Sequence, residues 1–158
     1  MKMLVTGAGG FIGGALVKTL QELDQDVMGT TREVLDLLAL GDLSRFGHQD
    51  VVYLCGGKTR FIDCESDPTA YRINVDAQLA IARHFLGAKI IYLSSEAVER
   101  GLHTNYGMHK ALVETALWGI CSPRIARICQ KVTTYNLQSC CDWLSELPRK
   151  PPGVYRWP

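Results

Sequence analysis

Short apolar runs alternate with helical patterns along most of the chain. Runs rich in β-branched and aromatic residues predict strands at 3–6, 26–30, 33–38, 50–56, 89–95 and 124–129. Apolar residues at helical spacing predict helices over 11–23, over 40–47, within 65–86 from near Pro68, and over 105–119. Strands that alternate with helices require right-handed crossovers and a parallel sheet covered on both faces. The predicted fold class is therefore α/β, a doubly wound, Rossmann-like sheet in a single domain.

The pattern changes near the C-terminus. The segment "NLQSCCDWLSEL" predicts one short helix, and "PRKPPGVYRWP" is rich in proline with no periodicity. No strand is predicted after residue 129. We therefore expect a nucleotide-binding domain over 1–130 and a short tail over 131–158.

Composition narrows the possible functions of this chain. Its 158 residues fit one domain, and a net charge of +1 provides no basic field for nucleic acid. No run of 18 apolar residues is present, so no membrane span is expected. The six cysteines form no Cys-x-x-Cys pair and the four histidines lie at no ligand spacing beside them, which disfavours zinc. With no secretory signal expected before the first strand, we expect reduced thiols and a cytoplasmic protein.

A glycine-rich loop, "TGAGGFIG" at 6–13, follows the first predicted strand and opens the first helix. Gly7 permits the tight turn, Gly10 permits close approach of a pyrophosphate, and Gly13 permits close packing of helix on sheet. The helix N-terminus then faces the phosphates. The spacing differs from G-x-G-x-x-G, and a glycine turn without a ligand is the alternative. The position in the first βα turn favours nucleotide binding.

The end of the second predicted strand bears on which cofactor is bound. NAD-selecting domains place an acidic residue there, whereas this chain has Thr30, Thr31 and Arg32. Hydroxyl groups and a guanidinium suit a 2′-phosphate, which favours NADP over NAD; a solvated arginine is the alternative. Asp36 could contact the adenine edge or equally cap a helix.

Tyr106 and Lys110 are four residues apart in the helix predicted over 105–119, so their side chains share a face. An ammonium beside the phenol would lower its pKa from about 10 and make it a usable acid/base. Ser94 and Ser95 end a predicted strand, where ligands bind in open α/β sheets. A serine hydroxyl there could orient a carbonyl oxygen that Tyr106 protonates, although "SSE" could also be a cap or turn.

Several segments together carry a family resemblance. "TGAGGFIG", "VVYLCGG", "FIDCESDPTAYRINVDAQLAIA", "IYLSSEAV" and "YGMHK" occur in this order over residues 1–130. They resemble the extended short-chain dehydrogenase/reductases of the NAD-dependent epimerase/dehydratase family, especially dTDP-4-dehydrorhamnose reductases. Alignment on Val98 places the catalytic hydroxyl at Ser95 rather than Ser94. Asn74 matches an asparagine that completes a catalytic tetrad in many relatives, and is equally consistent with an ordinary helix residue. The resemblance implies cofactor contacts at Gly7, Gly9, Gly10, Phe11, Ile12, Gly13, Thr31, Arg32, Asp36, Cys55, Gly56, Gly57, Asn74, Tyr106 and Lys110.

The resemblance implies hydride transfer at a carbonyl or carbinol carbon of a nucleotide-activated sugar. Tyr106 would be the general acid/base, Lys110 the ribose anchor, and Ser95 the residue that orients the oxygen. The family's C-terminal substrate lobe is mostly lacking here. The alternatives are a non-catalytic dinucleotide-binding module, a remnant that has lost its substrate domain, or a fragment that needs a second chain. In the family, the helix that contains Tyr106 commonly forms a homodimer.

Overall fold

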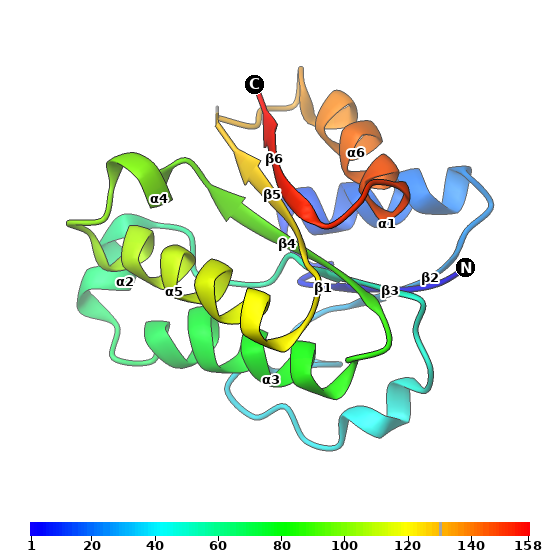
Figure 1. The fold of residues 1–158 in the computed structure, drawn as a ribbon, viewed down its shortest axis with the longest axis horizontal. Coiled ribbons are helices and arrows are strands. Elements are labelled where there is room, and N and C mark those ends of the chain that lie inside the picture. The colour runs from blue at the N-terminus through cyan, green and yellow to red at the C-terminus, as the bar shows by residue number, and fades with distance from the viewer. Residues whose placement is uncertain (130) are drawn as a thin grey trace.

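A computed structural model describes residues 1–129 and 131–158 (Figure 1). The described residues form one six-stranded sheet in the order β2-β1-β3-β4-β5-β6, and every neighbouring pair is parallel. The strands are β1 Lys2–Thr6, β2 Asp26–Thr30, β3 Val51–Leu54, β4 Lys89–Ser95, β5 Arg124–Ile128 and β6 Gly153–Trp157. The predicted α/β, Rossmann-like fold is confirmed.

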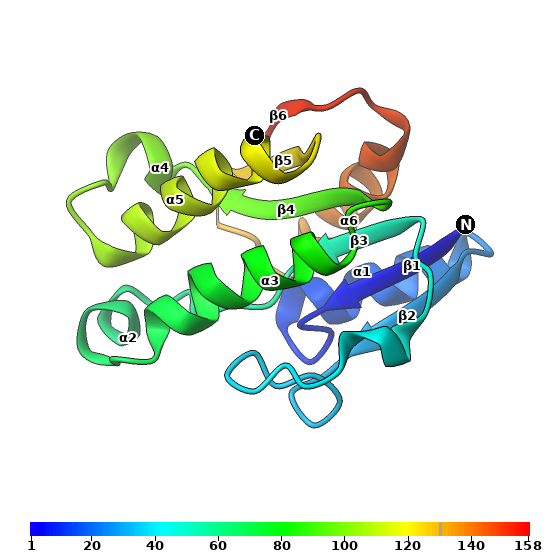
Figure 2. The same ribbon diagram turned by 60° about the horizontal axis from the view of Figure 1, so that its bottom comes forward.

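Helices cover both faces of the sheet (Figures 1 and 2). On one face lie α1 (Phe11–Glu22) and α6 (Leu137–Glu146); on the other lie α3 (Ala77–His84) and α5 (Asn105–Ile120). The pleat explains the division, because Met3 and Val5 of β1 pack in the core of α1 and α6, whereas Leu4 packs in the core of α3 and α5. The shorter elements are η1 Leu43–Phe46, α2 Phe61–Ser66, the π-helical η2 Arg72–Asp76, α4 Ala97–Arg100 and η3 Leu147–Arg149.

Two predicted elements are wrong, and a third differs only in helix type. The strand expected at 33–38 is wrong: these residues form turns with an isolated bridge, because the Asp36 carboxylate accepts a hydrogen bond from the Leu38 amide. The helix expected over 40–47 is only the 3₁₀ turn η1. The helix expected within 65–86 from near Pro68 is present as one continuous helical segment, η2 followed by α3, and differs only in its π-helical part at Arg72–Asp76.

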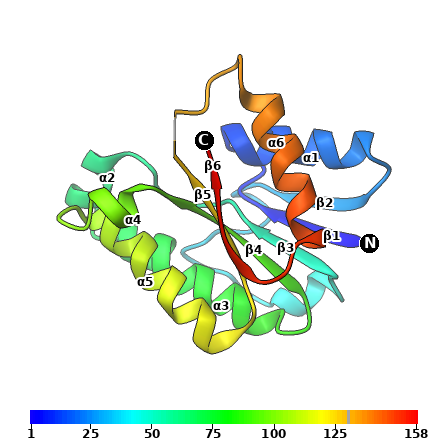
Figure 3. The ribbon, with the colours of Figure 1, turned by 45° about the horizontal axis from the view of Figure 1, so that its top comes forward.

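The last strand was missed by the sequence analysis, so the expectation of no strand after residue 129 is wrong. Figure 3 shows β6 beside β5 at the sheet edge and α6 beside α1. Cys140, Cys141, Leu144 and Trp157 are buried in the core of that face. The boundary expected at residue 130 lies outside the described residues. That residues 131–158 are the remnant of a substrate lobe stays a prediction.

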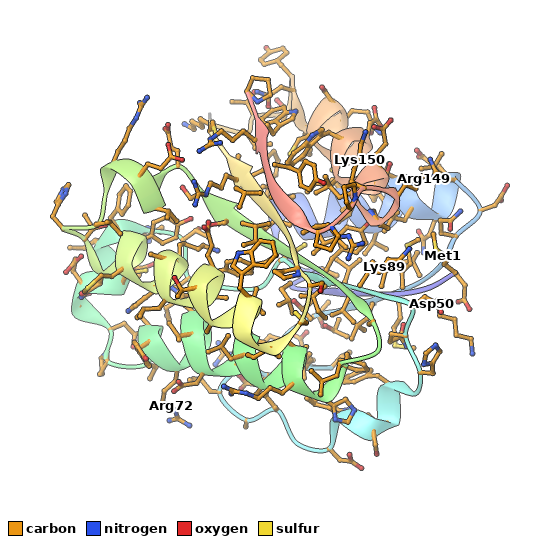
Figure 4. All side chains as sticks on the ribbon, in the orientation of Figure 1. Met1, Asp50, Arg72, Lys89, Arg149 and Lys150 are labelled. Carbon is orange, nitrogen blue, oxygen red and sulfur yellow. The ribbon has the colours of Figure 1, made fainter. Side chains whose placement is uncertain are left out.

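The amino and carboxyl ends of the parallel strands differ in the residues that they carry. The amino ends of the strands carry charged groups, and Figure 4 shows Asp50, Lys89, Arg149 and Lys150 lying toward this end. There the Asp50 carboxylate accepts a hydrogen bond from the Lys2 amide at 2.7 Å. The carboxyl ends carry the glycine loop and both serines, so the predicted site residues gather at the opposite edge. In the part of the chain that is described, no helix is long and apolar enough to cross a bilayer.

Candidate active site

The glycine loop is packed tightly between α1 and the end of β3. Gly7 has a φ of +69°, and a Cβ there would lie 2.6 Å from the Gly56 Cα. A Cβ at Gly13 would lie 2.3 Å from the Gly7 carbonyl oxygen. The Gly10 amide donates to the same carbonyl at 2.9 Å. The chain therefore passes directly from β1 into α1, and the N-terminus of that 12-residue helix faces the carboxyl edge of the sheet.

Two cavities meet at this loop, and both are lined by Gly7 and Gly57. The first, here the β2-side cavity, has a volume of about 490 Å³. The second, the Tyr106-side cavity, has a volume of about 640 Å³. They lie where the strand order reverses between β1 and β3, the point at which ligands bind in open α/β sheets. Together they form one elongated site centred on the glycine loop.

The β2-side cavity contains the residues predicted to choose between cofactors. Thr31, Arg32, Asp36, Gly56 and Gly57 line it. The Arg32 side chain is 80% exposed, and its Nε lies 3.9 Å from the Asp36 carboxylate. The structure thus leaves the guanidinium at the mouth of the cavity. The Asp36 carboxylate faces the same cavity while it holds the turn after β2.

A second charged pair in this cavity was missed by the sequence analysis. Lys58 and Asp67 both line it, and their Nζ and Oδ2 atoms are 2.7 Å apart. Hydrogen bonds from Lys58 and Thr69 hold the pKa of the Asp67 carboxyl well below its usual range. The sequence held a usable signal, since Lys58 directly follows the two glycines after β3. This position in the sequence is enough to predict that Lys58 lies at the carboxyl end of β3.

The Tyr106-side cavity brings together Ser95, Tyr106 and Lys110 with Gly10, Phe11, Ile12, Gly13, Cys55 and Gly57. The Lys110 ammonium donates to the Leu93 carbonyl at 2.6 Å and lies 5.8 Å from the centre of the Tyr106 ring. Burial lowers the pKa of Lys110 to about 8. Thr59, Phe61, Glu96, Lys131 and Val132 also line this cavity and were not predicted.

The environment of the Tyr106 phenol differs from the prediction. Burial raises the pKa of Tyr106, and hydrogen bonding to the Ser95 side chain acts in the opposite direction. The expected lowering of this pKa is therefore wrong for this arrangement, because burial outweighs the hydrogen bond to Ser95. The Phe61 ring contributes to that burial, because it meets the Tyr106 ring edge-on at 5.3 Å.

The two serines have different surroundings. They end β4, which is the fourth strand because no strand forms at 33–38. The Ser94 hydroxyl is buried and donates to the Glu114 carboxylate at 2.5 Å. The Ser95 hydroxyl accepts from the Ala97 amide at 3.2 Å and reaches Tyr106. Only the second serine is thus free to present its hydroxyl beside the phenol.

Two of the residues expected to contact the cofactor, Gly9 and Asn74, line neither cavity. The Asn74 amide oxygen accepts from the Lys58 amide at 2.7 Å, and its nitrogen donates to the Lys58 carbonyl at 2.9 Å. Because Asn74 is buried and holds the backbone in this way, it shapes the Gly57–Lys58 loop. In the structure it is a positioning residue for the cavity wall.

Comparisons with known proteins agree with this fold. Residues 1–112 match the family model described as the RmlD substrate binding domain. Among solved structures, dTDP-4-dehydrorhamnose reductase from Bacillus anthracis in complex with NADP is 16% identical with a TM-score of 0.85, over 99% of this chain and 74% of the other. The corresponding reductase from Yersinia enterocolitica is 26% identical with a TM-score of 0.73, over 83% and 53%.

A short-chain dehydrogenase/reductase superfamily protein from Agrobacterium tumefaciens with bound NAD is 20% identical, with a TM-score of 0.68, over 81% of this chain and 49% of that one. The chain therefore spans about half the length of two of these three proteins. No curated protein matches it in sequence. The family match covers residues 1–112, which is most of the chain. The chain belongs to the RmlD substrate binding domain family.

Proposed function

We propose that the chain binds a nicotinamide dinucleotide along the two connected cavities, with the pyrophosphate at the glycine loop. Bound dinucleotides in two structural neighbours, NADP in one and NAD in the other, support this cofactor class. The loop fits the cofactor, because no Cβ can be placed at Gly7 or Gly13 and the N-terminus of α1 points to the space between the cavities. The adenosine half would lie in the β2-side cavity and the nicotinamide in the Tyr106-side cavity.

NADP is proposed as the preferred form. Arg32 is free to turn toward a 2′-phosphate, because its contact with Asp36 is long and exposed. Thr31 lies beside it, with its hydroxyl bonded to Glu33. An Arg32→Met variant should therefore lose affinity for NADP and keep its affinity for NAD. Equal losses for both cofactors would contradict the proposed preference.

The proposed reaction is reversible hydride transfer at a carbon of a nucleotide-activated sugar. The observation that supports it is the convergence of Ser95, Tyr106 and Lys110 on the cavity that continues from the glycine loop. The bound cofactor would supply or accept the hydride. Tyr106 would give or take the proton on the substrate oxygen, Ser95 would orient that oxygen, and Lys110 would hold ribose hydroxyls.

A second candidate is a dinucleotide-binding module without turnover. The observation in its favour is the coverage of only 53% of the Yersinia enterocolitica reductase. The described residues form the six-stranded sheet with β6 and α6 packed in place, so the fold expected to bind the nucleotide is present in this chain. Under this candidate, the same cofactor binds and no sugar nucleotide is converted.

The testing experiment is a thermal-shift titration with NADP(H) and NAD(H), followed by turnover on a panel of sugar nucleotides. At a ligand concentration of 100 times Kd, binding should stabilise the folded state by about 2.7 kcal/mol. Tyr106→Phe should bind cofactor with wild-type affinity and lose turnover. No shift with either cofactor would refute both candidates, and a shift without turnover would favour the binding module.

The remaining proposals concern assembly and location. The helix α5 exposes Met108, Leu112 and Trp118, which supports a homodimer through this helix. Sedimentation of wild type and Leu112→Glu at equal concentration tests it, with a smaller species expected for the variant. The six free thiols support a cytoplasmic location, which fractionation would test.

A further inference from the structure

One face of α5 carries three polar residues, and only two of them belong to the proposed catalytic set. Tyr106, Lys110 and Glu114 follow one another at intervals of four, so they lie in a row along the helix. The Glu114 carboxylate lines neither cavity and its residue is only 5% exposed. A buried carboxylate is costly unless it is paired. Its partners therefore indicate what it does.

Each member of this row contacts the end of β4. The Tyr106 phenol meets Ser95, the Lys110 ammonium meets the carbonyl of the residue before Ser94, and the Glu114 carboxylate accepts the Ser94 hydroxyl at 2.5 Å. Three neighbouring strand residues, Leu93, Ser94 and Ser95, are thus each contacted from one of three successive helical turns. The contact of Glu114 fixes both the separation and the register of the two elements at the point where the hydroxyl, phenol and ammonium groups must meet.

Glu114 is also held by β5, where Arg127 is the register partner of Ser94. Arg127 donates through Nε to one carboxylate oxygen at 3.0 Å and through Nη2 to the other at 2.5 Å. This two-point contact fixes the plane of the carboxylate. The pKa of Arg127 is raised by these hydrogen bonds. Arg127 also donates to Glu99 of α4, the short helix that begins two residues after Ser95.

We infer that Glu114 is a positioning residue for the site, setting the end of β4 against α5 so that Ser95 lies beside Tyr106 and Lys110. The inference rests on the proposed catalytic role of those three residues. Arg127 keeps the carboxylate in its orientation, and the hydrogen bond from the Ser94 hydroxyl ties the end of β4 to that carboxylate. Glu114 contacts neither cavity, so it acts through these neighbours.

The pKa of Lys110 provides a second readout, because it should stay unchanged if Glu114 only supports the fold. The charged or ionisable groups facing this ammonium are Glu114 on its own helix, Cys55 after β3 and Cys64 of α2. The rings of Tyr92 and Tyr106 lie 4.7 Å and 5.8 Å away. Burial lowers the pKa of Lys110, and the negative charge of Glu114 opposes that lowering. Removing the charge should therefore lower this pKa further below about 8.

The experiment compares Glu114→Gln with Glu22→Gln, the same change in an exposed carboxylate of α1. Glu114→Gln should reduce kcat by up to about 100-fold, as a misplacement of about 1 Å can. The pKa of Lys110, followed by NMR of ¹³Cε-labelled lysine and assigned with Lys110→Met, should fall. Glu22→Gln should change neither quantity.

The inference is overturned if folded Glu114→Gln keeps both the wild-type kcat and the wild-type pKa of Lys110. If Glu114→Gln does not fold, Ser94→Ala decides, because it keeps the pair with Arg127 and removes the contact with β4. A reduced kcat with an unchanged pKa of Lys110 supports the inference there, and an unchanged kcat overturns it. If the wild type has no turnover, the proposed function has failed, and the pKa comparison alone tests the link between Glu114 and Lys110.

Discussion

Alanine at Gly13 should damage the site and the fold together, although alanine is ordinarily the better helix residue. A Cβ there would lie 2.3 Å from the Gly7 carbonyl oxygen and 2.9 Å from its carbon. Separations under 3.0 Å are essentially never seen, so α1 and the loop must part by about 0.7 Å. The loop cannot retreat, because Gly7 already lies against the Gly56 backbone. Overpacking of this kind costs about 1–3 kcal/mol, which outweighs the gain of up to about 1 kcal/mol in helix propensity.

The same substitution elsewhere provides the control. Gly119 lies in α5, and a Cβ there would meet nothing within 4 Å. Gly119→Ala should therefore raise the free energy of unfolding by about 0.5–1 kcal/mol. Urea denaturation measures both variants, and a fluorescence titration with NADP(H) measures the affinity. We expect Gly13→Ala to lose stability and to bind at least about tenfold more weakly, a loss of about 1.4 kcal/mol. Wild-type stability and affinity in Gly13→Ala would refute the steric reasoning.

Three further predictions concern the core and the charged groups. Leu144→Ala should cost about 2–5 kcal/mol in urea denaturation, because Leu144 is fully buried between α6 and the sheet. The lowered pKa of Lys110 means that this residue binds more protons in the unfolded chain between about pH 8 and 10.5, so its own contribution to stability should rise with pH across that window. The raised pKa values of the buried Cys55, Cys140 and Cys141 thiols act in the opposite direction, so the Lys110 contribution is measured as the difference between wild type and Lys110→Met. Glu99 accepts from both Arg127 and Arg156, which are register partners on β5 and β6. Glu99→Gln should therefore lower Tm, more at low than at high salt, and adding Arg156→Met should restore part of it.

The parallel strands were the most predictable part of the fold. The sequence analysis placed strands at 26–30 and 89–95, and β2 and β4 have those bounds. A central strand such as β4 is buried on both faces and reads as a continuous apolar run. The glycine loop was equally readable, because its spacing is dictated by backbone contacts that permit no side chain.

The errors arose where tertiary contacts or local turns override periodicity. Leu35 and Leu37 of the expected strand at 33–38 pack against the core and the Gly56 loop, so their apolar character serves packing and no strand is needed. The strand β6 contains only five residues at the sheet edge, where alternate side chains are exposed. Its pairing with β5 is a long-range contact that no local pattern reports. The Lys58–Asp67 pair similarly depends on two segments meeting in space.

The site therefore divides into a part that the chain completes by itself and a part that depends on a few unpredicted residues. The nucleotide half is built from the glycine loop and the carboxyl ends of β1, β2 and β3, which adjoin in the sheet. Around Tyr106 the outer wall comes from Phe61 at the start of α2, which is 55% exposed, and from Lys131 and Val132 after β5. Under the proposed function, these are the groups that a substrate must contact. Substitution of Phe61 or Lys131 should accordingly change the choice of substrate more than the affinity for the cofactor.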